Sequence, residues 1–216
     1  MKTGLMGGTF NPIHNAHLRI AEVALVACGL DRVIFIPVAD PPHKQLAGGV
    51  LFGRRCEMVR LAIAGNPFFE ISPLEGERCG KSYSIDTIQI FRKQMPNDEL
   101  FFIIGGDSFL EIGLWRCYAD IFRFCHLIVF ERPGSIIIDL YDALPADIKV
   151  EFNYNGGSRR LLHETGHFVQ FVPDILLDIS STEIRRLSAD GKSIDALVPP
   201  EVAAYISQQR IYSKCP

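Results

Sequence analysis

Residues 7–17 read Gly7-Gly8-Thr9-Phe10-Asn11-Pro12-Ile13-His14-Asn15-Ala16-His17, and this stretch decides the fold that we expect. It follows the short apolar segment 4–6, which is typical of a buried strand that ends in a tight glycine turn. Apolar residues then recur at helical spacing up to Gly29, a candidate helix C-cap. Because glycine lets backbone N–H groups approach an anion, and a helix N-terminus favours negative charge, a phosphate group fits at this turn.

The rest of the chain alternates between strand and helix patterns, which predicts an α/β fold with a doubly wound, mainly parallel sheet. Further strands are expected at 33–37, 68–71, 100–104, 127–130 and 168–172, and further helices at 52–63, 85–95, 180–188 and 200–209. We expect a single domain over residues 1–216, with 180–216 as a small C-terminal helical part. Ligands of such sheets bind outside the carboxyl ends of the strands.

Two segments lack a clear pattern. The polar residues 75–81 are interpreted as a loop. Residues 135–166 have weak periodicity, and their polar segment 153–160 is interpreted as an insertion.

Composition narrows the classes of protein. The formal net charge of -3 argues against non-specific nucleic-acid binding, which needs a basic surface. No segment has the roughly 18 uninterrupted apolar residues of a membrane helix, and no signal peptide is apparent. No cysteine pair has CxxC spacing, so we expect reduced thiols in a cytoplasmic protein. The six cysteines are Cys28, Cys56, Cys79, Cys117, Cys125 and Cys215.

His14 and His17 are three residues apart at the expected helix start, so both can face one ligand. Imidazole N–H groups donate well to phosphate oxygens. A metal site is the competing interpretation, but HxxH lacks the glutamate of HExxH and no third ligand is apparent, so we predict no protein-bound metal. A second alternative is that both histidines only cap and pack the helix.

A second anion site is indicated by Ile179-Ser180-Ser181-Thr182-Glu183-Ile184-Arg185. Ser180 and Glu183 have the spacing of a capping box, so a plain helix start is one interpretation. The segment also offers two further hydroxyls and the guanidinium of Arg185 beside the exposed N–H groups of a helix start. Two anion sites in one chain suit a polyphosphate.

These two motifs resemble the nucleotidyltransferase superfamily with HxxH and ISSTxxR motifs, and the segments between them resemble its bacterial nicotinate-nucleotide adenylyltransferase branch. The resemblance runs from the first strand to the last helix and is weakest over 135–166. The matching middle segments are Pro41-Pro42-His43-Lys44, Ser82-Tyr83-Ser84-Ile85-Asp86-Thr87, Ile104-Gly105-Gly106-Asp107-Ser108, Trp115 and Arg132-Pro133-Gly134.

The resemblance implies a Rossmann-like fold and the transfer of AMP from ATP to nicotinate mononucleotide, with Mg²⁺ bound mainly through ATP phosphates. It implies a step of NAD biosynthesis that yields deamido-NAD and pyrophosphate. The implied catalytic residues are His14, His17, Lys44 and Arg185. The implied ATP contacts are Gly7, Gly8, Thr9, Phe10, His14, His17, Gly105, Asp107, Ser180, Ser181, Thr182 and Arg185. The implied contacts to the mononucleotide are Lys44, Ser82, Tyr83, Asp107, Trp115 and Arg132.

Several of these residues also have plainer interpretations. Trp115 is the only tryptophan and could be packed in the core, Lys44 could be solvated, and Asp107 could cap a helix. The chain has Ala16 where glycine is frequent in the family, and Ser84 where threonine is frequent. Neither change removes an expected phosphate ligand.

Two rival functions stay open at this point. One is another adenylyltransferase of the superfamily, acting on nicotinamide mononucleotide or phosphopantetheine. The other is a non-catalytic nucleotide-binding protein. The sequence also leaves the oligomeric state open, including a homo-oligomer.

Overall fold

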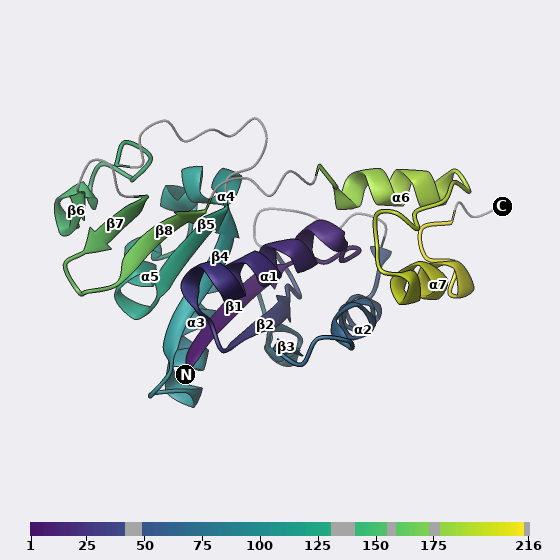
Figure 1. Cartoon of the computed structure of the whole chain (residues 1–216), viewed down its shortest axis with the longest axis horizontal. Helices are drawn as coiled ribbons and strands as arrows, with labels where there is room; N and C mark the ends of the chain where they lie inside the picture. The colour runs from purple at the N-terminus through teal and green to yellow at the C-terminus, as the bar shows by residue number, and fades with distance from the viewer. Residues whose placement is uncertain (42–48, 131–140, 155–158, 173–177, 214–216) are drawn as a thin grey trace.

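The computed structural model describes residues 1–41, 49–130, 141–154, 159–172 and 178–213. Its sheet has the strand order β3-β2-β1-β4-β5-β8-β7-β6 (Figure 1). Neighbouring strands from β3 to β8 in this order are parallel, whereas β7 pairs antiparallel with β8 and with β6. The strands are β1 (Lys2–Gly8), β2 (Arg32–Pro37), β3 (Phe69–Ile71), β4 (Glu99–Gly105), β5 (His126–Phe130), β6 (Phe152–Tyr154), β7 (Arg160–His163) and β8 (Phe168–Val172).

Helices cover both faces of this sheet, so the prediction of a doubly wound α/β fold is confirmed. One face carries α1 (Asn15–Cys28), α2 (Phe52–Ile63), α6 (Ser181–Ala189) and α7 (Pro200–Gln208). The other carries α3 (Ser84–Gln94), α4 (Gly106–Leu110) and α5 (Tyr118–Phe124). Short 3₁₀ turns are η2 (Leu74–Glu77), η3 (Ile112–Leu114) and η4 (Lys149–Glu151). None of the helices in the described ranges is long and apolar enough to cross a membrane.

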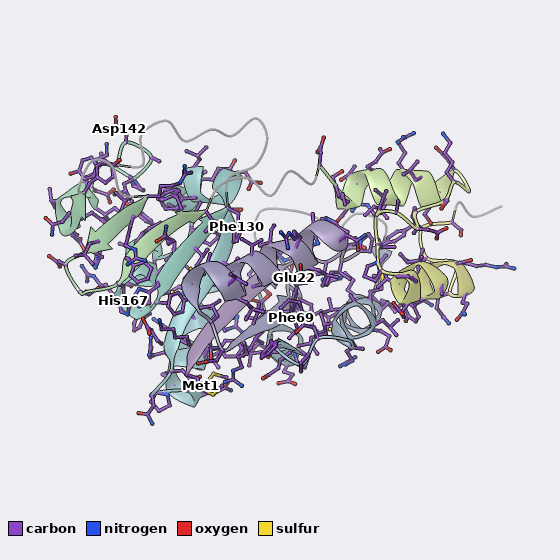
Figure 2. All side chains as sticks on the ribbon, viewed as in Figure 1. Met1, Glu22, Phe69, Phe130, Asp142 and His167 are labelled. Atoms are coloured by element: carbon purple, nitrogen blue, oxygen red, sulfur yellow. The ribbon has the colours of Figure 1, made fainter. Side chains whose placement is uncertain are left out.

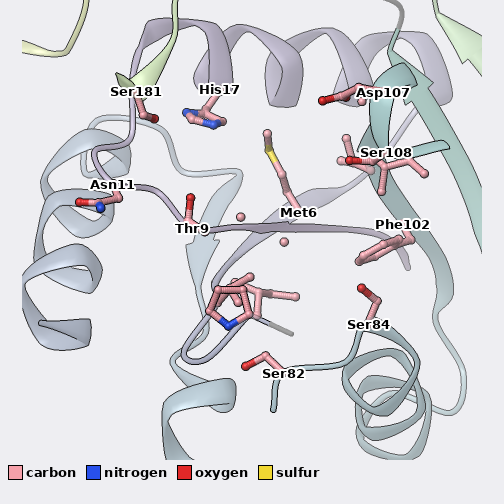
Figure 3. A pocket seen from close by; sticks show the side chains of 18 of the residues that line it. Met6, Thr9, Asn11, His17, Ser82, Ser84, Phe102, Asp107, Ser108 and Ser181 are labelled. Atoms are coloured by element: carbon pink, nitrogen blue, oxygen red, sulfur yellow. The ribbon is translucent and has the colours of Figure 1, made fainter. Parts of the chain in front are cut away.

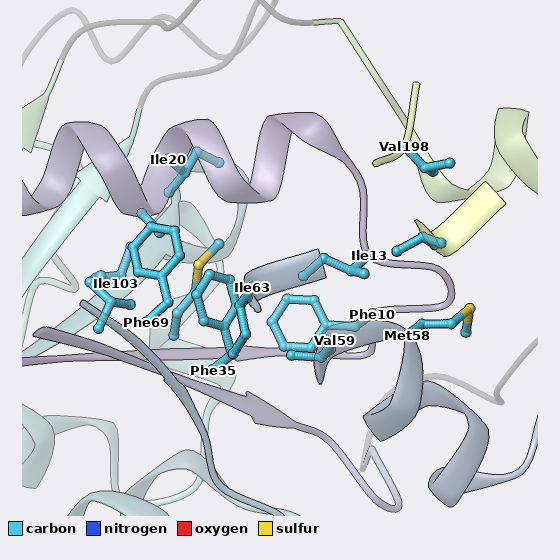
Figure 4. Packing of buried hydrophobic residues seen from close by; sticks show 14 of the residues in the cluster. Phe10, Ile13, Ile20, Phe35, Met58, Val59, Ile63, Phe69, Ile103 and Val198 are labelled. Carbon is cyan, nitrogen blue, oxygen red and sulfur yellow. The ribbon is translucent and has the colours of Figure 1, made fainter. Parts of the chain in front are cut away.

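Each face of the sheet has its own apolar cluster, because successive side chains of a strand point to opposite faces. Phe35 of β2 and Ile103 of β4 pack with Phe69 beneath Ile20 of α1 (Figure 4). Their neighbours along the strands, such as Phe102, belong to the cluster on the other face. Continuous apolar runs are therefore expected in these central strands, as the sequence has them.

The helix that follows the glycine loop ends where the sequence predicts. Gly29 caps α1 in the left-handed conformation, with φ of 61°, and its N–H donates to the carbonyl of Leu25. A residue with a Cβ is strained in this conformation, which explains the glycine.

The polar segment 153–160, interpreted as an insertion, joins the sheet at both of its ends, and the stretch 135–166 contains strands that its weak periodicity does not indicate. Residues 152–154 and 160–163 form β6 and β7, which extend the sheet at the end far from α6 and α7 (Figure 1). Leu161 and His163 are buried and alternate with the exposed Arg160 and Leu162. This period of two is hidden because a histidine occupies an inward position and both strands are very short. Residues 155–158 lie outside the described residues.

The five cysteines in the described ranges form no disulfide with one another: Cys28, Cys56, Cys79, Cys117 and Cys125. Cys215 lies outside those ranges. The assignment of residues 1–216 to one domain stays a prediction, although α6 and α7 pack on the same apolar cluster as α1 and α2.

His126 is a buried histidine at the amino end of β5, at the opposite end of the strand from the cavity side of the sheet. Its ring meets that of His167, which Figure 2 labels, with centroids 4.9 Å apart. Its Nδ1 accepts the N–H of Phe168 at 3.1 Å, and its Nε2 lies 3.1 Å from the Glu99 carboxylate. The neutral ring therefore carries its proton on Nε2, and protonation of Nδ1 would break the bond to Phe168. Burial, and then the nearby charges of His167 and Arg160, lower the pKa of His126 to about 4.

We expect the free energy of unfolding to fall as the pH drops from 6.5 towards 4. In this window the unfolded chain binds a proton at His126 and the folded chain does not, so the contribution is complete above pH 6.5 and lost below it. One such proton gives a slope of at most about 1.4 kcal/mol per pH unit. Urea unfolding across this range measures the slope, and His126→Asn should flatten it. Equal slopes for the two proteins would contradict the prediction.

Candidate active site

A cavity of about 690 Å³ opens at the carboxyl ends of β1 and β4, at the switch point of the strand order. Figure 3 shows Thr9 and Asn11 on one side of it, Asp107 and Ser108 on the opposite side, and Ser82 and Ser84 below. The cavity brings together these residues predicted for the site: Gly7, Gly8, Thr9, His14, His17, Ser82, Tyr83, Gly105, Asp107, Trp115, Ser180, Ser181, Thr182 and Arg185.

Three predicted residues are not among those that line the cavity. Lys44 and Arg132 lie outside the described residues. Phe10 does not line it, because its ring is buried under the loop against Phe35. A Cβ on Gly8 would lie 2.9 Å from that ring, which explains why glycine is needed there.

The loop between β1 and α1 has an irregular backbone. Phe10 has a positive φ of 45°, and the peptide bond between Asn11 and Pro12 is cis. The loop then leads into α1, whose N-cap is His14. The two histidines therefore stand where the positive end of the helix dipole faces the cavity.

His14 and His17 are stacked, with ring centroids 3.7 Å apart. His17 Nδ1 accepts the N–H of His14 at 3.3 Å, so His17 does cap the helix, as the plainer interpretation holds. Both residues nevertheless line the cavity. Because Nδ1 is used as an acceptor, Nε2 of His17 is the nitrogen that can donate to a ligand. Within the described ranges, no group of three His, Cys, Asp or Glu side chains gathers at a possible metal site.

The second predicted motif is joined to the first by hydrogen bonds. The hydroxyl of Ser181 donates to the carbonyl of Pro12 at 2.9 Å. Arg185 Nη1 donates to the carbonyl of Asn11 at 2.8 Å, across 174 residues, and Nη2 donates to the hydroxyl of Thr182 at 3.0 Å. The start of α6 and the glycine-histidine loop therefore form one wall of the cavity.

The capping box at the start of α6 is half formed. Ser180 Oγ accepts the N–H of Glu183 at 3.2 Å, as predicted. The carboxylate of Glu183 instead makes two hydrogen bonds to Arg186, at 2.6 and 2.9 Å. A nearby guanidinium is a stronger partner for this carboxylate than a backbone N–H group.

Trp115 follows η3 on the other side of the cavity and is half-buried. Its ring meets the edge of Phe102, with centroids 6.3 Å apart, and the residue lines the cavity beside Tyr83. Trp115 can therefore both pack against Phe102 and contact a ligand in the cavity.

Ser82 is hydrogen-bonded to Asp40: its N–H donates to the Asp40 carbonyl at 2.9 Å, and its hydroxyl accepts the Asp40 N–H at 3.3 Å. Because the N–H of Ser82 is used in this bond, the backbone N–H groups that can bind a ligand here are those of the first turn of α3.

The structure adds residues to the site that sequence reasoning missed. The hydroxyl of Tyr212 donates to Asn11 Oδ1 at 2.7 Å, and burial raises the pKa of this phenol, so it keeps its proton. Arg55 of α2 is fully buried beneath the glycine loop. Glu75 is buried and lines the cavity, and it belongs to the 3₁₀ turn η2, which overlaps the start of the predicted loop 75–81. Of these, only Arg55 has a signal in the sequence, since it shares the inward face of α2 with Cys56 and Val59.

Comparison with known families agrees with this class of fold and site. Residues 5–187 match the family model described as cytidylyltransferase-like. The structure of a *Plasmodium falciparum* nicotinic acid mononucleotide adenylyltransferase complexed with NaAD aligns with a TM-score of 0.74 at 19% identity, over 98% of each chain. The same enzyme complexed with APC aligns with a TM-score of 0.72 at 18% identity, over 98% of this chain and 96% of that one. The fold is therefore that of a nucleotidyltransferase.

Relatives of high sequence identity show which family of nucleotidyltransferases the chain belongs to. A probable nicotinate-nucleotide adenylyltransferase of *Pelobacter propionicus* is 67% identical over 216 residues, which is 100% of both chains. One of *Geobacter metallireducens* is 55% identical over 213 residues, or 99% of both chains. The chain belongs to the nicotinate-nucleotide adenylyltransferase family of nucleotidyltransferases, and the resemblance seen in its sequence is confirmed.

Proposed function

We propose that the chain transfers the adenylyl group of ATP to nicotinate mononucleotide, giving deamido-NAD and pyrophosphate in NAD biosynthesis. One observation carries this proposal beyond family membership: a single cavity joins the two motifs that we expect to bind anions to an aromatic side chain. A polyphosphate fits the first part and a nucleotide base fits the second.

The two substrates would divide the cavity between them. ATP would bind the glycine loop, His14, His17, Gly105, Asp107 and the start of α6, from Ser180 to Arg185. The mononucleotide would bind beside Trp115, with its carboxylate at the first turn of α3 near Ser82 and Tyr83, and with Asp107 shared between the substrates. Lys44 and Arg132 are proposed from the family resemblance alone.

The reaction needs no general base. A phosphate oxygen of the mononucleotide, already anionic at neutral pH, would attack the α-phosphorus of ATP. The bond from the α-phosphorus to the oxygen that bridges to the β-phosphorus breaks, and pyrophosphate leaves with its electron pair. Catalysis would then rest on positioning and on stabilising the charge that develops. His17 Nε2 and the Arg185 guanidinium would donate to phosphate oxygens.

Mg²⁺ would be held mainly by the substrates. The described residues offer no cluster of three metal-binding side chains, while the carboxylate of Asp107 lines the cavity. This donor set fits a cation that keeps most of its water and phosphate ligands. When bound, Mg²⁺ neutralises phosphate charge.

The proposal is tested by adding ATP and nicotinate mononucleotide to the protein and measuring pyrophosphate. Mass spectrometry should identify deamido-NAD as the second product. Parallel reactions with nicotinamide mononucleotide and phosphopantetheine test the two rival acceptors. Faster turnover of either rival would replace the proposed acceptor, and binding of ATP without product from any acceptor would favour a non-catalytic protein.

Trp115→Ala should raise KM for nicotinate mononucleotide by about 5- to 50-fold, because stacking on an aromatic side chain contributes about 1–3 kcal/mol per base. KM for ATP should change less than about twofold, since the expected ATP contacts lie on other elements. Trp115→Phe is the matched control and should keep most of the affinity. Equal losses for both substrates would show that Trp115 only packs against Phe102.

We also propose a cytoplasmic location, which the free thiols of the described cysteines support.

A further inference from the structure

Arg55 is a buried arginine beneath the glycine loop, with none of its surface exposed. It lies in the first turn of α2, and its guanidinium lies over the ring of Phe52, 5.4 Å from the centroid. Nη1 donates to two backbone carbonyls, those of Thr9 and Val38, both at 2.7 Å. Nε and Nη2 have no hydrogen-bond partner among the residues that the structure describes.

Packing alone does not account for an arginine at this position. Burial disfavours the charged guanidinium and lowers its pKa, and the described part of the chain has no carboxylate within salt-bridge distance of it. An apolar side chain of similar length would avoid this desolvation penalty. What an apolar side chain could not do is hold the two carbonyls.

Both carbonyls belong to the ATP side of the cavity. Thr9 follows Gly8 in the loop after β1, and Val38 follows the last residue of β2. The N–H of Val38 donates in turn to the carbonyl of Gly8 at 2.8 Å. Arg55 therefore connects the ends of two neighbouring strands where both reach the cavity.

The contact to Thr9 also sets the orientation of a peptide unit. Because the peptide bond is planar and trans, a Thr9 carbonyl directed at Arg55 makes the next N–H, that of Phe10, point away from it. Without the guanidinium, the buried carbonyls would lose a charged donor, and the loop could rotate to find another. The backbone N–H groups of this loop would then no longer be fixed for an anion.

We infer that Arg55 is a positioning residue for ATP: its buried guanidinium fixes the Thr9 and Val38 carbonyls and thereby preorganises the glycine loop. This inference rests on the proposed function, in which that loop binds ATP. Arg55 acts through the backbone and does not touch the substrate itself.

Arg55→Met removes the donors and keeps most of the side-chain length. We expect it to weaken ATP binding at least about tenfold, or about 1.4 kcal/mol, because a loop whose N–H groups are no longer fixed must be ordered when ATP binds. KM for nicotinate mononucleotide should change less than about threefold. Arg55→Lys restores one charged donor group and should recover part of the ATP affinity. Calorimetric titration with ATP and steady-state kinetics measure both effects.

Ile63→Ala is the matched control, since Ile63 is the last residue of the same helix, about two turns beyond Arg55, and is buried in the apolar cluster of Figure 4. It should lower the melting temperature and leave both KM values near those of the wild type. If Arg55→Met is unfolded at 25 °C by circular dichroism, Arg55→Lys decides, with an ATP-selective loss expected.

Two results would overturn the inference: wild-type ATP affinity in a folded Arg55→Met or Arg55→Lys protein, or equal losses for both substrates. Failure of the proposed function is recognised separately. In that case the wild type releases no pyrophosphate, while calorimetry with ATP still tests Arg55.

Discussion

Replacing His17 with alanine is expected to lower kcat by about 100-fold or more, the usual effect of removing one donor to a developing negative charge. Its Nδ1 accepts the N–H of His14, and its ring stacks on His14, so the neutral ring carries its proton on Nε2, the nitrogen proposed to donate to a phosphate oxygen. KM for ATP should change much less, because most of the expected phosphate contacts remain. Steady-state kinetics with both substrates measure the two effects.

Two further variants at this position separate the cap from the chemistry. The amide oxygen of asparagine can take the place of Nδ1, and the amide nitrogen of glutamine can reach the place of Nε2. His17→Asn should therefore preserve the cap and still lose activity, whereas His17→Gln should weaken the cap and recover part of the turnover. An active asparagine variant beside an inactive glutamine variant would mean that His17 only caps α1.

The central part of the fold is predictable because its sequence signals are local. The buried run 100–104 becomes β4, and Gly29 ends α1 where the left-handed conformation requires glycine. The extension by β6 and β7 is not predictable in this way. Its strands have three and four residues, and their stability comes from the pairing of β7 with β8 and of β6 with β7 rather than from their own composition.

The candidate site likewise has a part that can be predicted from local sequence and a part that cannot. His14, His17 and the segment 180–185 are recognisable because each motif is compact in the sequence, and the structure brings them to one cavity. Tyr212 acts on Asn11 across 201 residues, and no pattern near either residue indicates this contact. Arg55 had a weak signal, a charge on an apolar helix face, that becomes meaningful only once Thr9 and Val38 are seen beside it.

Replacing Arg185 with methionine is expected to lower kcat/KM for ATP by about 100-fold or more, and to weaken product inhibition by pyrophosphate. The guanidinium is half-buried at the cavity and is already oriented by Asn11 and Thr182, so little freedom is lost when a phosphate binds. Arg185→Lys keeps the charge without the planar fork and should recover only part of the activity.

Tyr212→Phe measures how much of this loss comes from bracing the loop at Asn11 and not from the charge of Arg185. It removes a different hydrogen bond to Asn11 and leaves the charge unchanged. If Arg185 stabilises phosphate charge, Tyr212→Phe should change kcat/KM less than about threefold, and KM for ATP in the wild type should rise with salt more steeply than in Arg185→Met. If Arg185 only braces the loop, Tyr212→Phe and Arg185→Lys should resemble Arg185→Met, and the salt dependence should be the same in all four proteins. We expect the charge of Arg185 to account for most of the loss of activity. None of these substitutions removes the hydrogen bond from Ser181 to Pro12, which continues to hold the loop.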